Sequence, residues 1–154
     1  MANQATAFRE AYKGTAAINS TAFSPGSDDS TSIRIAYDRV NADHWALWGI
    51  VLPETDVSSL KLAFDIKGQV GGERPNVWLV SSGSPSEVRN VVDIEDYVTV
   101  TTNWQRAEIP PTDFRDPWGH QQPIDLTRIL RVEIAFEWEN MAGMVYVDGF
   151  AFEP

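Results

Sequence analysis

The strongest constraint on this chain is the alternation of apolar and polar residues between residues 60 and 80, because it is typical only of β-structure. In the segment LKLAFDIK every second residue is a large apolar one, and in NVWLV the apolar Val77 and Leu79 alternate with other residues. A repeat of two places successive side chains on opposite faces of a strand. Glycines between the segments supply a turn that tolerates positive φ. We therefore expect two strands joined as a hairpin.

Trp78 interrupts the polar face of this hairpin. If Val77 and Leu79 point into the core, Trp78 points to the opposite side. A large aromatic ring among charged neighbours on an outer face has no packing role, and it predicts a place where a flat ligand binds. The alternative is that a loop covers the ring.

Short alternating segments continue through the chain, separated by turn residues. The further expected strands cover residues 32–38, 45–52, 88–92, 97–102, 104–109, 132–138 and 144–152. No segment keeps a helical repeat beyond about one turn. About eight to ten short strands separated by turns predict an all-β protein, a β-sandwich of two antiparallel sheets. Since the sequence shows no linker, repeat or low-complexity tract, we expect a single domain over residues 1–154.

Two of these strands have faces that bear on a binding site. In WALWGIVL we expect the face of Trp48 to be core, because the face of Trp45 also carries a glycine. The pattern fits either assignment, so both rings stay candidates for display. In VEIAFEW, Glu133 and Glu137 are expected to point outward and Trp138 inward.

The composition excludes several classes of function. The 154 residues have a formal net charge of -10 and a mean hydropathy of -0.26, which indicate a globular chain. The charge argues against nucleic acid and anionic membranes, and against strongly acidic polymers unless a local basic patch overrides it. No apolar run approaches the roughly 20 residues of a membrane helix. Cysteine is absent, which excludes disulfides and zinc–thiolate sites, and the first residues do not resemble a signal peptide.

The order of several motifs resembles one fold family. The segments SIRIAYD, WALWGIVLP and LKLAFDIKGQVGGE are followed by TTNWQRAEIP with DF after it, then VEIAFEWE and VYVDGF. This order is similar to that of the galactose-binding-like β-jelly-roll carbohydrate-binding modules, over about residues 32–152. Many such modules carry a second acidic residue where this chain has Gly149.

The resemblance implies a non-catalytic module that keeps an attached glycoside hydrolase on its polysaccharide. The protein would then be extracellular, part of a larger enzyme, and a monomer. The resemblance favours a β-linked plant-wall glucan such as cellulose, mixed-linkage glucan or xyloglucan, while the net charge favours a neutral polymer.

The resemblance also implies a structural calcium ion distant from the sugar site. Asp148 in the last expected strand matches the usual aspartate ligand, and Glu10 is the expected partner near the N-terminus. Calcium prefers six to eight oxygen ligands, many of them anionic.

The expected sugar site combines stacking rings with polar side chains that bind hydroxyl groups. The candidate rings are Trp78, Trp45 and Trp48. The candidate polar partners are Arg34, Lys61, Asp65, Glu133, Glu137 and His44. Trp118, in a long loop, is either a loop anchor or a contact at the rim of the site. We expect Trp104 and Trp138 to be structural.

Two other functions stay open. Some relatives of this fold are protein-interaction or assembly domains, and others are jelly-roll glycoside hydrolases or lyases. For catalysis, Glu133 and Glu137 lie four residues apart on one strand, which places their α-carbons roughly 13 Å apart. That separation is too long for a retaining pair. The segment EIAFE also has Ala135 where jelly-roll β-glucanases place an aspartate.

Overall fold

A computed structural model describes residues 7–28, 30–119 and 122–154, and it confirms the predicted all-β sandwich. The strands are β1 (Ala7–Tyr12), β2 (Ala17–Phe23), β3 (Ser32–Val40), β4 (Ala46–Thr55), β5 (Lys61–Gly68), β6 (Asn76–Ser81), β7 (Val88–Asp93), β8 (Gln105–Ile109), β9 (Ile129–Phe136) and β10 (Met141–Glu153). Two short 3-10 turns, η1 (Ile94–Asp96) and η2 (Pro111–Asp113), are the helical segments of the described residues. None of the helices in this part of the chain has the length and apolar character to cross a membrane.

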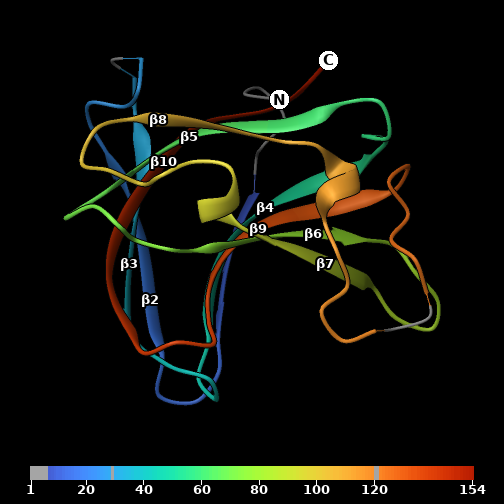
Figure 1. The fold of residues 1–154 in the computed structure, drawn as a ribbon, viewed down its shortest axis with the longest axis horizontal. Helices are drawn as coiled ribbons and strands as arrows, with labels where there is room; N and C mark the ends of the chain where they lie inside the picture. Colours follow the sequence, from blue (N-terminus) through green and yellow to red (C-terminus); the bar gives the residue numbers. More distant parts are fainter. Residues whose placement is uncertain (1–6, 29, 120–121) are drawn as a thin grey trace.

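The strands form two five-stranded antiparallel sheets that pack against each other (Figure 1). Sheet A has the order β1-β4-β9-β6-β7, and sheet B has the order β2-β3-β10-β5-β8. Most strands pair with partners distant in sequence, as in the pairing of β10 with both β3 and β5. Each sheet therefore has one face toward the shared core and one face toward solvent.

Large side chains from both sheets fill the core. Trp48, Phe64 and Phe136 are almost fully buried. Tyr37 of sheet B stacks on Phe136 of sheet A with ring centres 3.7 Å apart. Phe64 stacks on Phe150 within sheet B at 4.7 Å. The Tyr37–Phe136 contact joins the two sheets face to face, and dense packing of this kind tolerates little displacement.

The alternating segments at residues 60–80 form two strands, but the predicted hairpin is wrong. β5 pairs with β10 and β8 in sheet B, whereas β6 pairs with β7 and β9 in sheet A. The glycine-rich connection is a crossover between the sheets, in which Gly71 and Gly72 adopt φ values of 90° and 82°. The Gly72 amide donates to the Val100 carbonyl at 2.8 Å, which holds the crossover in place. As a consequence, the outer faces of β5 and β6 lie on opposite sides of the molecule.

Two other segments depart from the expected pattern. Residues 97–102 form no strand, because this irregular segment follows η1 and its carbonyls accept hydrogen bonds from the crossover. The N-terminal region, which has little alternation, forms the edge strands β1 and β2.

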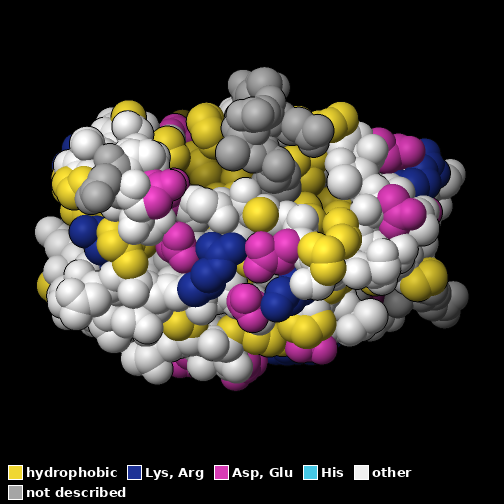
Figure 2. Space-filling model, turned by 90° about the horizontal axis from the view of Figure 1, so that it is seen from above, with side chains coloured by type: hydrophobic (Ala, Val, Ile, Leu, Met, Phe, Trp, Pro, Cys, Tyr) yellow, Lys and Arg dark blue, Asp and Glu magenta, His cyan; other side chains and the backbone are white. Residues whose placement is uncertain are grey.

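The outer surface over β5 and β8 carries interspersed charges (Figure 2). Lys61 pairs with Glu108 at 3.0 Å, and Arg106 pairs with Asp65 at 3.1 Å and with Glu153 at 3.4 Å. This part of the surface is therefore locally close to neutral although the chain is acidic.

We expect Phe64→Ala to lower the free energy of unfolding by about 3–5 kcal/mol, because it removes a fully buried ring and leaves a cavity between the sheets. Urea unfolding followed by circular dichroism measures the change. Val70→Ala is the control, since Val70 is exposed in the crossover and its loss should leave stability nearly unchanged. Equal effects of the two substitutions would contradict the assignment of Phe64 to the core.

Candidate functional site

The outer face of sheet A carries a second apolar cluster, separate from the core between the sheets. Leu47, Ala135, Trp78 and Val91 are buried there, one from each of the strands β4, β9, β6 and β7. Leu47 lies opposite Ala135, and Trp78 lies opposite Val91. Trp45 packs against this cluster from the residue before β4 and stays partly exposed. An outer face buries such side chains only where other parts of the chain cover them.

Two further tryptophans and an arginine provide that cover. The Trp118 ring stacks on Trp78 with centres 5.2 Å apart and planes inclined by 20°, and the Trp138 ring lies 6.0 Å from Trp78 at 56°. The Arg89 guanidinium lies 5.0 Å from the Trp78 ring centre. Trp78 is 1% exposed, whereas Trp118 is 53% and Trp138 43% exposed. We call Trp78, Trp118 and Trp138 the tryptophan cluster; its two outer rings face solvent.

Local backbone features bring the two outer rings onto this face. Trp138 follows β9 with a φ of 71°, a left-handed conformation that ends the alternation of the strand. Trp118 belongs to a loop that is held against the edge strand β7, because the backbones of Val91 and Arg115 exchange hydrogen bonds of 2.8 and 3.1 Å. The Trp118 amide then donates to the Asp116 carboxylate at 2.8 Å. The rings are thus positioned by main-chain contacts and not by the strand repeat.

A charged network lies beside the tryptophan cluster. Glu133 of β9 is fully buried and accepts hydrogen bonds from Arg89 and Arg131. Arg131 also binds Glu87 through two hydrogen bonds of 2.9 and 2.6 Å, and this contact lowers the pKa of Glu87. Across the strands, a Cβ at Gly49 would approach the Glu133 side chain to 3.1 Å, so the glycine leaves room for the network. The charges on this face therefore compensate one another.

Glu137 links the network to the buried tryptophan. The Trp78 indole nitrogen donates a hydrogen bond to the Glu137 carboxylate. Burial raises the pKa of Glu137, while this hydrogen bond and the charge of Arg89 act in the opposite direction. A cleft of about 170 Å³ lies beside these groups, lined in part by Asn76, Glu137 and Trp138. Rings, charged groups and a cleft thus meet at one end of the outer face.

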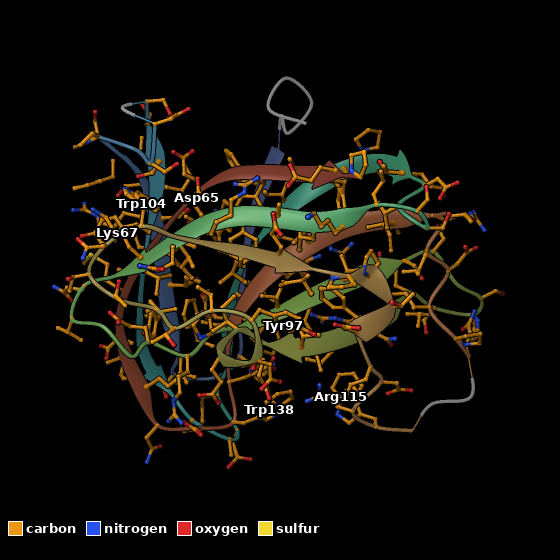
Figure 3. All side chains as sticks on the ribbon, turned by 45° about the horizontal axis from the view of Figure 1, so that its top comes forward. Asp65, Lys67, Tyr97, Trp104, Arg115 and Trp138 are labelled. Atoms are coloured by element: carbon orange, nitrogen blue, oxygen red, sulfur yellow. The ribbon has the colours of Figure 1, made fainter. Side chains whose placement is uncertain are left out.

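The predicted polar residues are divided between two faces. Glu133 and Glu137 lie beside Trp78, as expected. The remaining strand residues lie on the outer face of sheet B: Arg34, Lys61 and Asp65. The prediction that these join Trp78 in one site is wrong, because β3 and β5 belong to sheet B. Figure 3 shows Asp65 beside Lys67 and Trp104, well apart from Trp138.

The predicted rings are also partly corrected. Trp78 lies on the predicted outer face, but the prediction that it is displayed is wrong because the other two rings of the cluster cover it. Trp48 is 1% exposed in the core, against Phe8 and Phe150, so its candidacy as a binding ring is wrong. Trp45 is the more exposed ring of the pair, but it is only partly exposed because it packs against the apolar cluster, and its role as a binding ring stays a prediction.

His44 serves a local structural contact. Its Nδ1 accepts a hydrogen bond from the Thr15 amide at 2.8 Å, which ties the β1–β2 turn to the segment before β4. The ring also packs over Gly14, where a Cβ would lie 1.8 Å from Nδ1. His44 makes no contact with the tryptophan cluster among the interactions of the described residues.

Sequence reasoning missed Trp138 and Arg131 and left Trp118 undecided. The prediction that Trp138 points inward is wrong, because the positive φ turns it onto the outer face. A signal was present in the turn residues Glu139 and Asn140, which place Trp138 at the end of the alternating run. The position of Trp118 has no comparable local signal.

The two predicted calcium ligands have separate hydrogen-bond partners. Glu10 accepts a hydrogen bond from the Ser20 amide at 2.9 Å, and Asp148 accepts one from the Ser27 amide at 2.9 Å. Asp65, opposite Asp148 across the sheet, accepts a hydrogen bond from the Ser27 hydroxyl. Within the described ranges no group of three or more His, Cys, Asp or Glu could hold a metal. Glu10 and Asp148 thus have different partners in this structure, and a calcium site that includes them stays a prediction.

Comparisons with known proteins give one family match and several matches of fold. The family model described as carbohydrate binding domain 30 matches residues 3–154. No curated protein matches the sequence.

Several solved structures share the fold. A family 11 carbohydrate-binding module from Clostridium thermocellum, in complex with a β-1,3-1,4-mixed-linked tetrasaccharide, is 20% identical with a TM-score of 0.78, covering 95% of this chain and 88% of that one. A family 11 carbohydrate-binding module of the Clostridium thermocellum cellulosomal cellulase Lic26A-Cel5E is 19% identical with a TM-score of 0.78, covering 95% of this chain and 86% of that one. A family 30 module of the Clostridium thermocellum cellulosomal cellulase Cel9D-Cel44B is 22% identical with a TM-score of 0.63, covering 79% and 73%.

We expect Glu137→Gln to stabilise the fold increasingly as the pH rises above the ordinary pKa of a glutamate. A pKa raised by burial means that the folded state binds the proton more tightly, so ionisation of Glu137 costs stability as the pH rises through the folded-state pKa. Glutamine keeps an acceptor for the Trp78 indole and carries no charge. Urea unfolding of both proteins between pH 4 and pH 8 measures the difference.

The matched control is Glu139→Gln, at an exposed carboxylate two residues further on. Because Glu139→Gln removes the carboxylate of an exposed ion pair with Arg74, it should not stabilise the fold at any pH of the series. A Glu137→Gln protein that becomes progressively less stable than the wild type with rising pH would show that the ionised form is favoured, contrary to this prediction.

Proposed function

The chain belongs to the carbohydrate binding domain 30 family, and we propose that it binds a neutral β-linked glucan across the outer face of sheet A. The observation that carries this proposal is the tryptophan cluster, in which Trp118 and Trp138 expose their rings above the buried Trp78. Sugar rings present apolar C–H faces that pack on such indoles, and their hydroxyl groups need polar partners at the edges. Trp78 serves as the support against which the two outer rings rest.

The charges around the cluster favour a neutral ligand. Arg89 and Arg131 are both engaged with Glu133, and Arg131 with Glu87. Arg115 at the edge of the sheet pairs with Asp93 at 3.5 Å. Paired groups of this kind still offer hydrogen bonds to hydroxyls, but they present little net field to attract an ionic polymer.

The choice of a β-glucan is supported by the fold relatives. The related family 11 module binds a β-1,3-1,4-mixed-linked tetrasaccharide, so mixed-linkage glucan is the first candidate here, with cellulose and xyloglucan as the other plant-wall glucans. If a sugar stacks as a nucleobase does, each ring contributes about 1–3 kcal/mol, and two rings give micromolar to millimolar affinity.

We further propose that residues 1–154 form one non-catalytic, monomeric module attached to an extracellular glycoside hydrolase. The family match over nearly the whole chain supports a single module, and relatives that come from cellulosomal cellulases support the enzyme context. A non-catalytic role is supported by Glu133, a buried carboxylate already engaged by two guanidinium groups and therefore poorly placed to act on a substrate.

We expect Trp118→Ala and Trp138→Ala each to weaken binding to mixed-linkage β-glucan by about tenfold, because each removes one stacking ring. Affinity gel electrophoresis with the soluble polymer measures the dissociation constants. Trp104→Ala removes a partly exposed indole from the opposite sheet, so its retardation should equal that of the wild type.

Two outcomes would refute the proposal for this face. One is unchanged retardation of both cluster variants alongside normal folding by circular dichroism. The other is a loss of glucan binding in Trp104→Ala alone, which would place the glucan on sheet B.

A further inference from the structure

The outer face of sheet B carries aromatic and cationic side chains that alternate across its strands. Tyr146 of β10 lies opposite Lys67 of β5 on one side and opposite Arg34 of β3 on the other. Trp104, directly before β8, continues this line beside Lys67, and Phe23 of β2 closes it at the far edge. We call these five residues the aromatic–cation row. All five are partly exposed.

Ring faces surround the two cations of the row. The Lys67 ammonium lies 5.0 Å from the ring centre of Tyr146, 5.1 Å from that of Trp104 and 5.7 Å from that of Phe23. The Arg34 guanidinium lies 5.8 Å from the ring centre of Phe23. Aromatic faces attract a cation without neutralising it, so the row keeps two formal positive charges.

Neither cation has a carboxylate partner among the described residues, although the chain has 22 acidic against 12 basic residues. Arg34 donates to the Thr21 hydroxyl at 3.3 Å, and the Lys67 ammonium lies over three aromatic rings. Most other basic residues form ion pairs: Arg39, Lys61, Arg74, Arg89, Arg106, Arg115, Arg128 and Arg131. Two cations without a carboxylate partner, one on each side of Tyr146, indicate a place for an external anion in so acidic a chain.

The nearest carboxylates of this face are held by other groups. Asp65 and Asp148 lie opposite each other in the part of the sheet next to the row. Asp65 binds Arg106, and both carboxylates accept hydrogen bonds from Ser27. The two carboxylates mark the boundary of the positively charged surface, because they repel an anion that binds to the aromatic–cation row.

We propose that the aromatic–cation row is a second carbohydrate-binding surface, which takes a sugar chain that carries carboxylate groups, such as a uronate polymer. The rings of Trp104, Tyr146 and Phe23 provide apolar contact for sugar faces, and the cations at positions 67 and 34 bind the carboxylate through charge-assisted hydrogen bonds. Charge complementarity separates this surface from the tryptophan cluster, whose arginines are paired. The local positive area overrides the repulsion expected from the net charge.

The test is affinity gel electrophoresis at low salt in gels that contain glucuronoxylan, or the same polymer after chemical reduction of its carboxyl groups. The wild type should be retarded by the acidic polymer and not by the reduced one. We expect the double variant Lys67→Gln/Arg34→Gln to weaken the retardation about tenfold or more, because two charge-assisted contacts are lost. Trp104→Ala, which leaves both charges in place, should also weaken it.

The matched control is Lys61→Gln/Arg106→Gln, which removes the same charge from ion-paired residues of the same face. It should keep the retardation, as should Trp118→Ala on the opposite sheet. The proposal would be overturned if the reduced polymer retarded the wild type as strongly as the acidic polymer does. It would also be overturned if the control double variant lost as much retardation as Lys67→Gln/Arg34→Gln. Either result shows that no specific carboxylate site exists. If only Trp118→Ala lost retardation in the glucuronoxylan gel, the acidic polymer would be assigned to sheet A and the proposal would fail. Glucan binding by the same variants is measured separately, so failure here does not affect the function proposed for sheet A.

Discussion

The shared core of the sandwich is the constraint on which the rest of the structure depends. Each strand gives one of its two faces to the packing of Trp48, Phe64 and Phe136 between the sheets. The other face is then forced outward, and its direction depends on which sheet the strand has joined. The set of side chains on each outer surface is thus a consequence of sheet membership. The tryptophan cluster and the aromatic–cation row are the two results, one on each side.

The fold could be predicted from sequence where alternation is strong. The strands at residues 32–40, 61–68 and 129–136 carry clear repeats, and they occupy central positions that bury one full face. The edge strands at residues 7–12 and 17–23 have weak repeats, because partly exposed strands need fewer apolar side chains. The crossover at Gly71 and Gly72 resembled a hairpin turn, since glycines permit both connections and only tertiary pairing distinguishes them.

The candidate site was predictable in part, for a related reason. Alternation alone placed Trp78 and Glu133 on an outer face, and the structure agrees. It could not show that β5 and β6 face opposite ways, so Lys61 and Asp65 were grouped with the wrong tryptophan. The cover over Trp78 comes from a backbone reversal at one residue and from a loop held to β7, and neither produces a periodic signal. Loop placement of this kind is decided by long-range contacts.

The separation of the two outer faces has a consequence for valency. They share no strand, and the two sheets of such a sandwich lie about 10 Å apart, so two polymer chains on them cannot compete for a side chain or touch each other. On the proposal that both faces bind sugar polymers, a module with both faces occupied would join a neutral chain to an acidic one. In a wall where neutral and acidic polysaccharides are interwoven, each binding event raises the local concentration for the other. The module would then stay bound to the mixed wall for longer than to either polymer alone.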